Sequence, residues 1–131
     1  MAERRASCSC GGLRVKTRGE PVRVSICHCI ACQRRTGSTY GAQARFAEDQ
    51  VEIEGESVEY ARKADSGNTI RFRFCPSCGA TVYYSLDEAP GIVAVPVGAF
   101  ADPEFPAPRF SVYEARQHHW VHVPDDVEHY D

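Results

Sequence analysis

Three cysteines stand close together early in the chain, at Cys27, Cys29 and Cys32. Thiolates at this spacing can converge on one metal ion, but a closed structural zinc site has four ligands. Catalytic zinc sites commonly have three protein ligands and one open position. An incoming thiol bound at such a position would lose its proton and become a nucleophile at neutral pH. The spacing therefore favours an open metal site with an exchangeable fourth ligand.

The other four cysteines form two closely spaced pairs, Cys8 with Cys10 and Cys75 with Cys78. The glycine that follows the second pair lets the backbone fold so that amide N–H groups point at the sulfurs. Two such pairs can complete a tetrahedral four-thiolate site even when they are far apart in the sequence. A redox C-x-x-C motif usually lies near a βαβ unit, and that context is missing. We therefore expect a structural zinc whose binding stabilises the fold.

Other residues could change these assignments. His28 lies between two of the clustered cysteines, where a histidine more often packs or hydrogen-bonds locally. A more distant ligand (His118, His119 or His122) could close the open site and make it structural. The sequence does not prove how the two cysteine pairs combine, and an iron–sulfur cluster is a further alternative, although no known cluster spacing matches. No residue can be named as a general acid or base.

Two short segments next to the clustered cysteines could bind substrate. Arg34 and Arg35 could form bidentate pairs with carboxylates, or they could be two solvated charges in a turn. Thr36, Gly37 and Ser38 could offer hydrogen-bond donors near the metal, or they could only lead into the next strand.

The segments that must position the cysteines show a period of two residues. "TIRFRF" at 69–74 alternates apolar and charged side chains, and 13–17 and 22–26 do the same, which is typical of strands with one buried face. Only the segment after Cys29 and the one at 47–50 look able to form helical turns. We predict an all-β fold of antiparallel sheets. The further predicted strands are 40–46, 51–53, 57–62, 81–84, 92–97 and 110–113.

Three aromatic residues outside these strands could line a pocket or fill the core. They are Phe100, Phe105 and Trp120. Large aromatic side chains of a small β domain are mostly buried, so we expect all three in the core.

The totals of the chain restrict its class. Its 131 residues, without a repeat or a long linker, predict a single zinc-binding domain over 1–131. A net charge of −3 and scattered basic residues, most of them expected on solvated strand and turn faces, make nucleic-acid binding a poor hypothesis. The first cysteine at position 8 leaves no room for a signal peptide, and the apolar stretch at 92–100 is too short to span a bilayer. We expect a soluble, cytoplasmic protein whose seven cysteines bind metal instead of forming disulfides.

Four motifs together resemble a known family. "CSCGG", "CHCIACQRRTGS", "FRFCPSCGATVYY" and "ARQHHWVHVPDD" occur in this order. The chain resembles the glutathione-dependent formaldehyde-activating enzymes, a family that also includes centromere protein V. The resemblance runs from about Cys8 to Pro124 and includes all seven cysteines.

The resemblance implies a fold, two metal sites and a reaction. The fold would be a β-tent, with antiparallel sheets clamped by structural zinc at Cys8, Cys10, Cys75 and Cys78. Glutathione would approach a second zinc, partly occupied, at the cluster of three cysteines. The implied activity is that of a carbon–sulfur lyase, which condenses glutathione with formaldehyde to S-hydroxymethylglutathione or acts on a related thiol adduct. The alternatives are a non-catalytic zinc-stapled binding module, as the centromere branch suggests, or a thiol redox switch.

Overall fold

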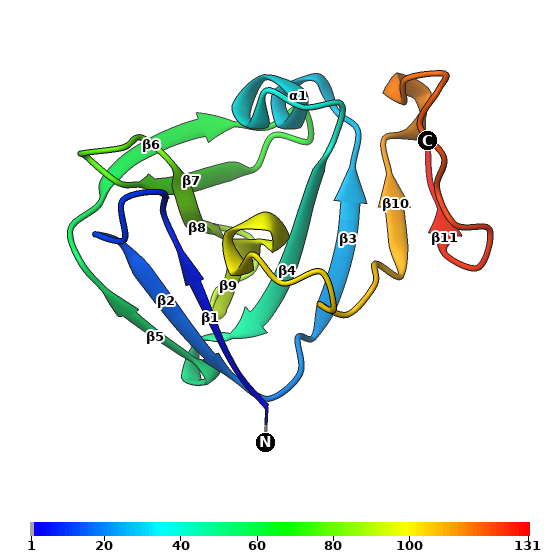
Figure 1. Cartoon of the computed structure of the whole chain (residues 1–131). Coiled ribbons are helices and arrows are strands. Elements are labelled where there is room, and N and C mark those ends of the chain that lie inside the picture. Colours follow the sequence, from blue (N-terminus) through cyan, green and yellow to red (C-terminus); the bar gives the residue numbers. More distant parts are fainter. Residues whose placement is uncertain (1) are drawn as a thin grey trace.

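The computed structural model describes residues 2–131, which form two β-sheets and one short helix, α1 (Ile30–Thr36) (Figure 1). The small sheet is antiparallel and has the order β1 (Glu3–Ser7), β2 (Arg14–Arg18), β5 (Val51–Glu54). The large sheet has the order β11–β10–β3–β4–β9–β8–β7–β6. Its strands are β3 (Arg23–Cys27), β4 (Gly41–Ala47), β6 (Val58–Lys63), β7 (Thr69–Phe74), β8 (Thr81–Leu86), β9 (Ile92–Pro96), β10 (Phe110–Val112) and β11 (Glu128–His129). Short 3-10 turns are formed by η1 (Glu48–Gln50), η2 (Val97–Phe100) and η3 (Glu114–Arg116).

The prediction of an all-β fold is confirmed, and every strand expected from the alternation is present, shifted by a residue or two at most. Two strands were not predicted. β1 has the sequence ERRAS, in which only Ala6 is buried, so it shows no apolar alternation. β11 has only two residues. The strands pair antiparallel as expected except at β10, which pairs in parallel with both β3 and β11 (Figure 1).

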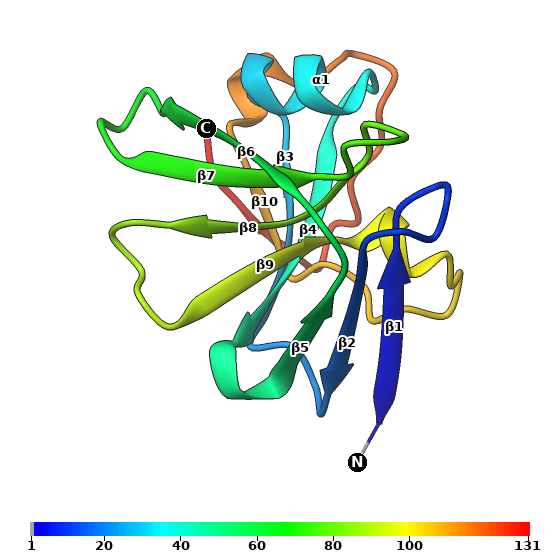
Figure 2. The same ribbon diagram turned by 90° about the vertical axis from the view of Figure 1, so that its left-hand side faces the viewer.

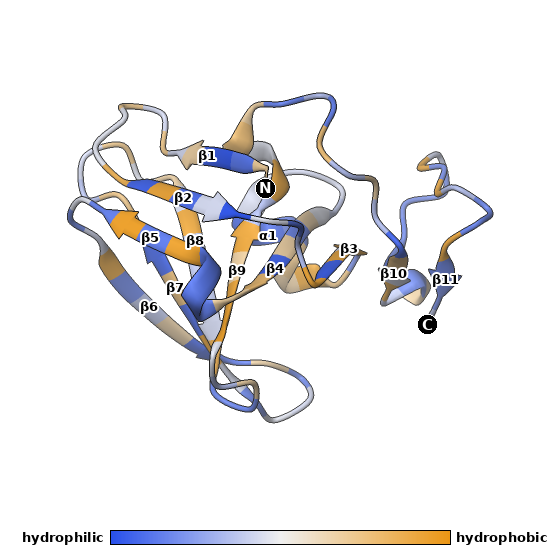
Figure 3. Cartoon of the chain, turned by 90° about the horizontal axis from the view of Figure 1, so that it is seen from below, coloured by the Kyte–Doolittle hydropathy of each residue, from blue (hydrophilic) through white to orange (hydrophobic). Residues whose placement is uncertain are grey.

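The two faces of the large sheet have different surroundings. One face packs against the small sheet, and apolar residues of both sheets form the main core there. Along β2 and β5, hydrophobic and hydrophilic residues alternate (Figure 3), and Val15 of β2 is buried in this core. The opposite face of the large sheet lines a cavity, and α1 lies across one end of β3 and β4 (Figure 2). The core between the sheets includes Ala6, Leu13, Val15, Val24, Ala44, Phe46, Val82 and Val95.

The aromatic residues outside the strands differ in burial. Phe100 is buried in the main core, and its ring stacks on that of Phe105 with the centroids 4.7 Å apart. The expectation for Trp120 was wrong, because 58% of its surface is exposed. Trp120 lies in the C-terminal loop, outside both sheets, and its ring contacts that of His118 edge-on, with the centroids 5.9 Å apart. The helices of residues 2–131 are too short and too polar to cross a membrane.

Candidate metal sites and the adjoining cavity

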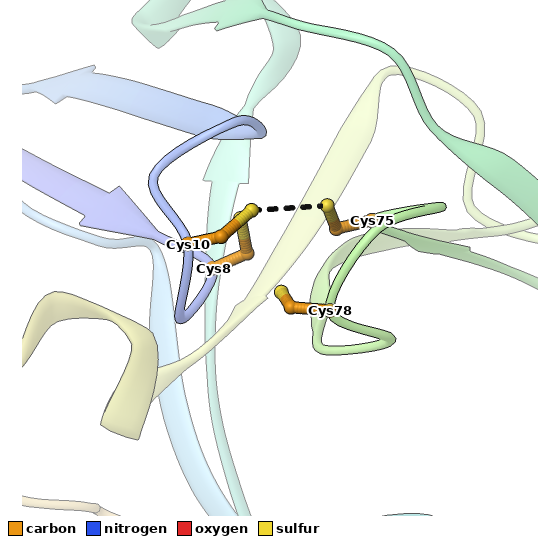
Figure 4. A group of neighbouring side chains, drawn as sticks. All are labelled: Cys8, Cys10, Cys75 and Cys78. Carbon is orange, nitrogen blue, oxygen red and sulfur yellow. Dashed lines mark hydrogen bonds between the residues drawn. The ribbon is translucent and has the colours of Figure 1, made fainter.

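Four cysteines from two distant turns come together between the sheets (Figure 4). Cys8 and Cys10 lie between β1 and β2, and Cys75 and Cys78 lie between β7 and β8. Their four Sγ atoms all lie within 4.8 Å of one another, with separations of 3.7 Å for Cys8–Cys10 and 3.6 Å for Cys10–Cys75. The edge of a tetrahedron with zinc–sulfur bonds of about 2.3 Å is about 3.8 Å. The four sulfurs therefore have the spacing that one tetrahedral ion requires.

The two turns share a backbone arrangement that directs their sulfurs. In each, the first cysteine's N–H donates to the carbonyl five residues later, Cys8 to Leu13 and Cys75 to Ala80, both at 3.0 Å. Gly79 adopts φ +80°, a left-handed conformation that glycine adopts without strain. The Leu13 N–H also donates to Cys8 Sγ at 3.2 Å, and this bond lowers the pKa of the Cys8 thiol to about 6 despite burial. Despite a backbone hydrogen bond from Gly12, hydrogen bonds with Cys75 and Cys8 raise the pKa of Cys10 to about 11, so Cys8 is the member of this pair that the turn favours as a thiolate.

The other three cysteines gather where β3 leads into α1. Cys27 ends β3, Cys29 is the N-cap of α1, and Cys32 lies in the first turn of the helix. Their Sγ atoms lie within 4.8 Å of one another. No histidine or carboxylate of residues 2–131 joins this group. His28 is fully buried, and its Nε2 forms a hydrogen bond with Ser111 Oγ at 2.9 Å instead.

The three sulfurs of this cluster form hydrogen bonds with one another that shift their pKa values in opposite directions. Hydrogen bonds with the other two sulfurs, first with Cys27, hold the pKa of Cys29 far below its ordinary value. The same contacts, first with Cys29, raise the pKa of Cys27. The positive charge of Arg62 also lowers the pKa of Cys29. Because thiolate ligands are the donors that zinc prefers, both cysteine clusters fit a zinc ion by donor type, and both could hold one.

A cavity of about 890 Å³ opens from the three-cysteine cluster along the free face of the large sheet. Its volume lies in the range of small-molecule sites, about 300–1,000 Å³. Five arginines line it, and in the part of the chain that the structure describes none of them has a carboxylate oxygen within 4.0 Å. Asp65 and Glu88 line it as well. The balance of charge favours an anionic ligand. The arginines are Arg23, Arg34, Arg35, Arg45 and Arg62.

Of the four residues predicted to contact substrate, the structure places two at the cavity and two outside its lining. Arg34 and Arg35 line the cavity, and the Arg35 guanidinium lies 5.2 Å from the ring centroid of Phe72. Thr36 and Gly37 are not among the lining residues. The hydroxyl of Thr36 donates to a carbonyl of the preceding turn at 2.8 Å, and Gly37, with φ +68°, caps the helix. Both residues lie at the end of α1, where Ser38 donates its N–H to Thr36.

Several residues at the cavity were not expected from the sequence. An added Cβ at Gly41 would lie 3.2 Å from Arg35 Nη2, so this glycine leaves room for the guanidinium beside the cysteines. Burial raises the pKa of Tyr84, so its hydroxyl stays a neutral donor. Arg45 lines the cavity with Gln43, so it is not one of the basic residues on a solvated outer face. A signal was present, because Gly41, Gln43 and Arg45 alternate with the apolar residues of one strand.

Comparisons with known proteins agree with these features. A family model described as "Glutathione-dependent formaldehyde-activating enzyme" matches residues 3–116. A protein of Schizosaccharomyces pombe named as an uncharacterized lyase is 29% identical over 85 residues. That match covers 65% of this chain and 59% of the relative, so the chain spans less than two thirds of the relative's length. A crystal structure of a Rhodobacter sphaeroides protein has the same fold, with a TM-score of 0.59 and 18% identity over 76% of this chain and 91% of that one.

Proposed function

The chain belongs to the family of glutathione-dependent formaldehyde-activating enzymes, and we propose that it is a zinc-dependent carbon–sulfur lyase that joins glutathione to formaldehyde or acts on a related thiol adduct. Family membership and the lyase-named relative support a lyase in general. One observation carries the finer proposal. The cluster of Cys27, Cys29 and Cys32 has no fourth protein ligand within residues 2–131, and it faces a cavity lined by unpaired arginines.

The two cysteine clusters would have different roles. The four-cysteine cluster is complete and joins the two sheets, so its zinc would be structural. The three-cysteine cluster would hold the second zinc with one position open to the cavity. Zinc bound there would lower the pKa of an incoming thiol and favour its thiolate form.

The residues of the cavity would bind and orient the reactants. Glutathione carries carboxylates, and Arg34 and Arg35 offer guanidinium groups that can pair with them. The neutral hydroxyl of Tyr84 can donate a hydrogen bond to the aldehyde oxygen, where negative charge develops. In the net reaction a carbon–sulfur bond forms and the thiol proton passes to the aldehyde oxygen, without oxidation or reduction.

Native mass spectrometry with and without glutathione tests this proposal. We expect two zinc ions in the wild-type protein and a glutathione adduct that is lost in Cys29→Ser. Exchange NMR of formaldehyde and glutathione should show condensation faster than the uncatalysed background, again lost in Cys29→Ser. Two zinc ions that are indifferent to glutathione, together with a background rate, would overturn the proposal in favour of a non-catalytic binding module.

A further inference from the structure

Two arginines face each other in the part of the cavity away from the cysteines. Arg23 of β3 and Arg45 of β4 are directly paired in the antiparallel register. Like charges in this position destabilise a sheet. Both side chains line the cavity, and the Nε atom of each is buried without a hydrogen-bond partner. Burial, and then the charge of Arg45, lower the pKa of Arg23. The protein thus holds two positive charges together at a cost.

Carboxylates of the protein do not neutralise this pair. No carboxylate oxygen in residues 2–131 lies within 4.0 Å of either guanidinium, although Glu128 acts on Arg23 from farther away. The Arg23 guanidinium lies 4.2 Å from the ring centroid of Phe110. By contrast, Arg73 of β7 does not line the cavity, and it forms an ion pair with Glu59 at 3.2 Å. Arg23 and Arg45 are therefore positioned for an anion that comes from outside the chain.

A buried amide lies between the two arginines and the three-cysteine cluster. Gln43 is only 7% exposed and pairs with Ser25 in the register, and its Nε2 donates to Ser25 Oγ at 3.0 Å. Its Oε1 is buried without a partner and lies 3.6 Å from where a Cβ of Gly41 would be. An unsatisfied buried acceptor is costly, so a ligand N–H at this place would remove a penalty. A peptide-like ligand supplies such an N–H.

We propose that Arg23 and Arg45 form a second oxyanion subsite, which binds a carboxylate of the substrate remote from its thiol. Gln43 then accepts a hydrogen bond from an N–H of the chain that connects the two groups. This inference rests on the proposed function, since it takes the thiol to lie at the three-cysteine cluster. From Cys27 to Arg23 the strand spans about 13 Å. The substrate class is therefore an elongated, peptide-like thiol with a distant carboxylate.

The test compares Arg45→Gln and Arg23→Gln with Arg73→Gln, a matched control on the outer face, all in the zinc-loaded full chain. Calorimetry measures binding of glutathione and of 2-mercaptoethanol, a thiol without a carboxylate. We expect each cavity variant to bind glutathione about tenfold more weakly and 2-mercaptoethanol as the wild type does. Arg45→Gln should also raise the Tm of the free protein, because a like-charge repulsion is removed. Arg45→Lys keeps the positive charge but loses the planar guanidinium that pairs with a carboxylate through two hydrogen bonds. It serves as a second variant if Arg45→Gln does not fold.

A thermal-shift series with inorganic phosphate separates the sources of the oxyanion. Unchanged glutathione affinity in both cavity variants overturns the assignment to a substrate carboxylate. If phosphate then stabilises the wild type and not the variants, the subsite holds a free oxyanion instead. If neither ligand distinguishes the variants from the wild type, there is no subsite. If the wild type binds no thiol at all, the proposed function fails, whereas phosphate protection lost in Arg45→Gln still supports the oxyanion subsite.

Discussion

The Sγ atoms of Cys10 and Cys75, which are 65 positions apart in the sequence, lie 3.6 Å from each other. Cys10 belongs to a turn of the small sheet and Cys75 to a turn of the large sheet. A metal ion bound between them would have to be released before the sheets could separate. Its binding energy would therefore stabilise the packing of both sheets. The three-cysteine cluster makes no such connection, because its members lie within a short segment of β3 and α1.

This difference predicts unequal effects of two equivalent substitutions. We expect Cys75→Ser to lower the Tm by more than about 10 °C, because a structural ligand is lost from a site coupled to folding. Cys29→Ser should lower it by less than about 5 °C, since Cys29 caps a short helix and its cluster does not join the two sheets. Differential scanning calorimetry of the zinc-loaded proteins measures both. Equal losses would contradict the division into a structural and an open site.

A methyl group at Gly41 should disturb the cavity without disturbing the fold. The added Cβ would lie 3.2 Å from Arg35 Nη2, the end of a flexible side chain, and 3.5 Å from Cys32 Cβ. We expect Gly41→Ala to weaken glutathione binding several-fold while the Tm stays within about 3 °C. Gly98→Ala is the matched control, because an added Cβ there meets nothing within 4 Å. Equal glutathione affinities of the two variants in a calorimetric titration would show that Arg35 does not contact the substrate.

The hydroxyl of Tyr84 should matter for the reaction more than for binding. Tyr84 makes no hydrogen bond to the residues that the structure describes, so Tyr84→Phe should fold with little change in Tm. We expect kcat/KM for the condensation, corrected for background, to fall about ten- to hundredfold with unchanged glutathione affinity. Tyr83→Phe is the control, because Tyr83 packs against the main core. A full rate in Tyr84→Phe would show that another group polarises the aldehyde.

The ion pair of His129 with Glu114, 2.7 Å long, should make stability depend on pH. Its hydrogen bond to Glu114 raises the pKa of His129 above the ordinary 6.5. The pair therefore stabilises the fold fully below pH 6.5, and this contribution is lost as pH rises through the raised folded-state pKa. Burial tends to raise the pKa of Glu114, but hydrogen bonds from Ser111 and His129 outweigh this effect and lower the pKa. The contribution of Glu114 is thus lost only in more acidic solution, as pH falls from 4.5 through the lowered folded-state pKa.

His129→Gln isolates this effect. We expect the Tm difference between the wild type and the variant to be largest near pH 6 and to shrink as pH rises to about 8. Thermal unfolding in a pH series measures it, with His119→Gln as the control, because His119 is exposed and forms no ion pair among residues 2–131. A difference that does not vary with pH would mean that the two residues interact without a change in protonation.

The large part of the fold that could be predicted rests on local patterns. Alternation located β2 and β7 because each has apolar residues on one face and charged ones on the other, whereas β9 is apolar throughout. The parallel partner of β3 could not be predicted, because pairing of Ser25 with Phe110 joins segments distant in sequence. Trp120 was misplaced because burial was argued from residue type, whereas its surroundings are set by a loop outside the sheets.

The candidate site was predictable in its cysteines and less so in its cavity. Close spacing brings Cys27, Cys29 and Cys32 together with little help from the rest of the chain. Arg23 was missed because alternation was interpreted as one buried and one solvated face, with Val22 inside. In fact β3 is covered on both sides, and Val22 is 59% exposed. A cavity lined by six separate strands and a helix leaves no continuous signal in the sequence.

The three members of the open cluster differ in how firmly their backbone is held. Cys27 is paired with Gly41 of β4 on one side and with Val112 of β10 on the other, whereas α1, which carries Cys32, has seven residues and none of them buried. Local opening is cheapest where few buried contacts must be broken. Amide hydrogen exchange should therefore be slow at Cys27 and fast along α1. We therefore expect Cys29 and Cys32 to separate from Cys27 more readily than the sheet itself opens.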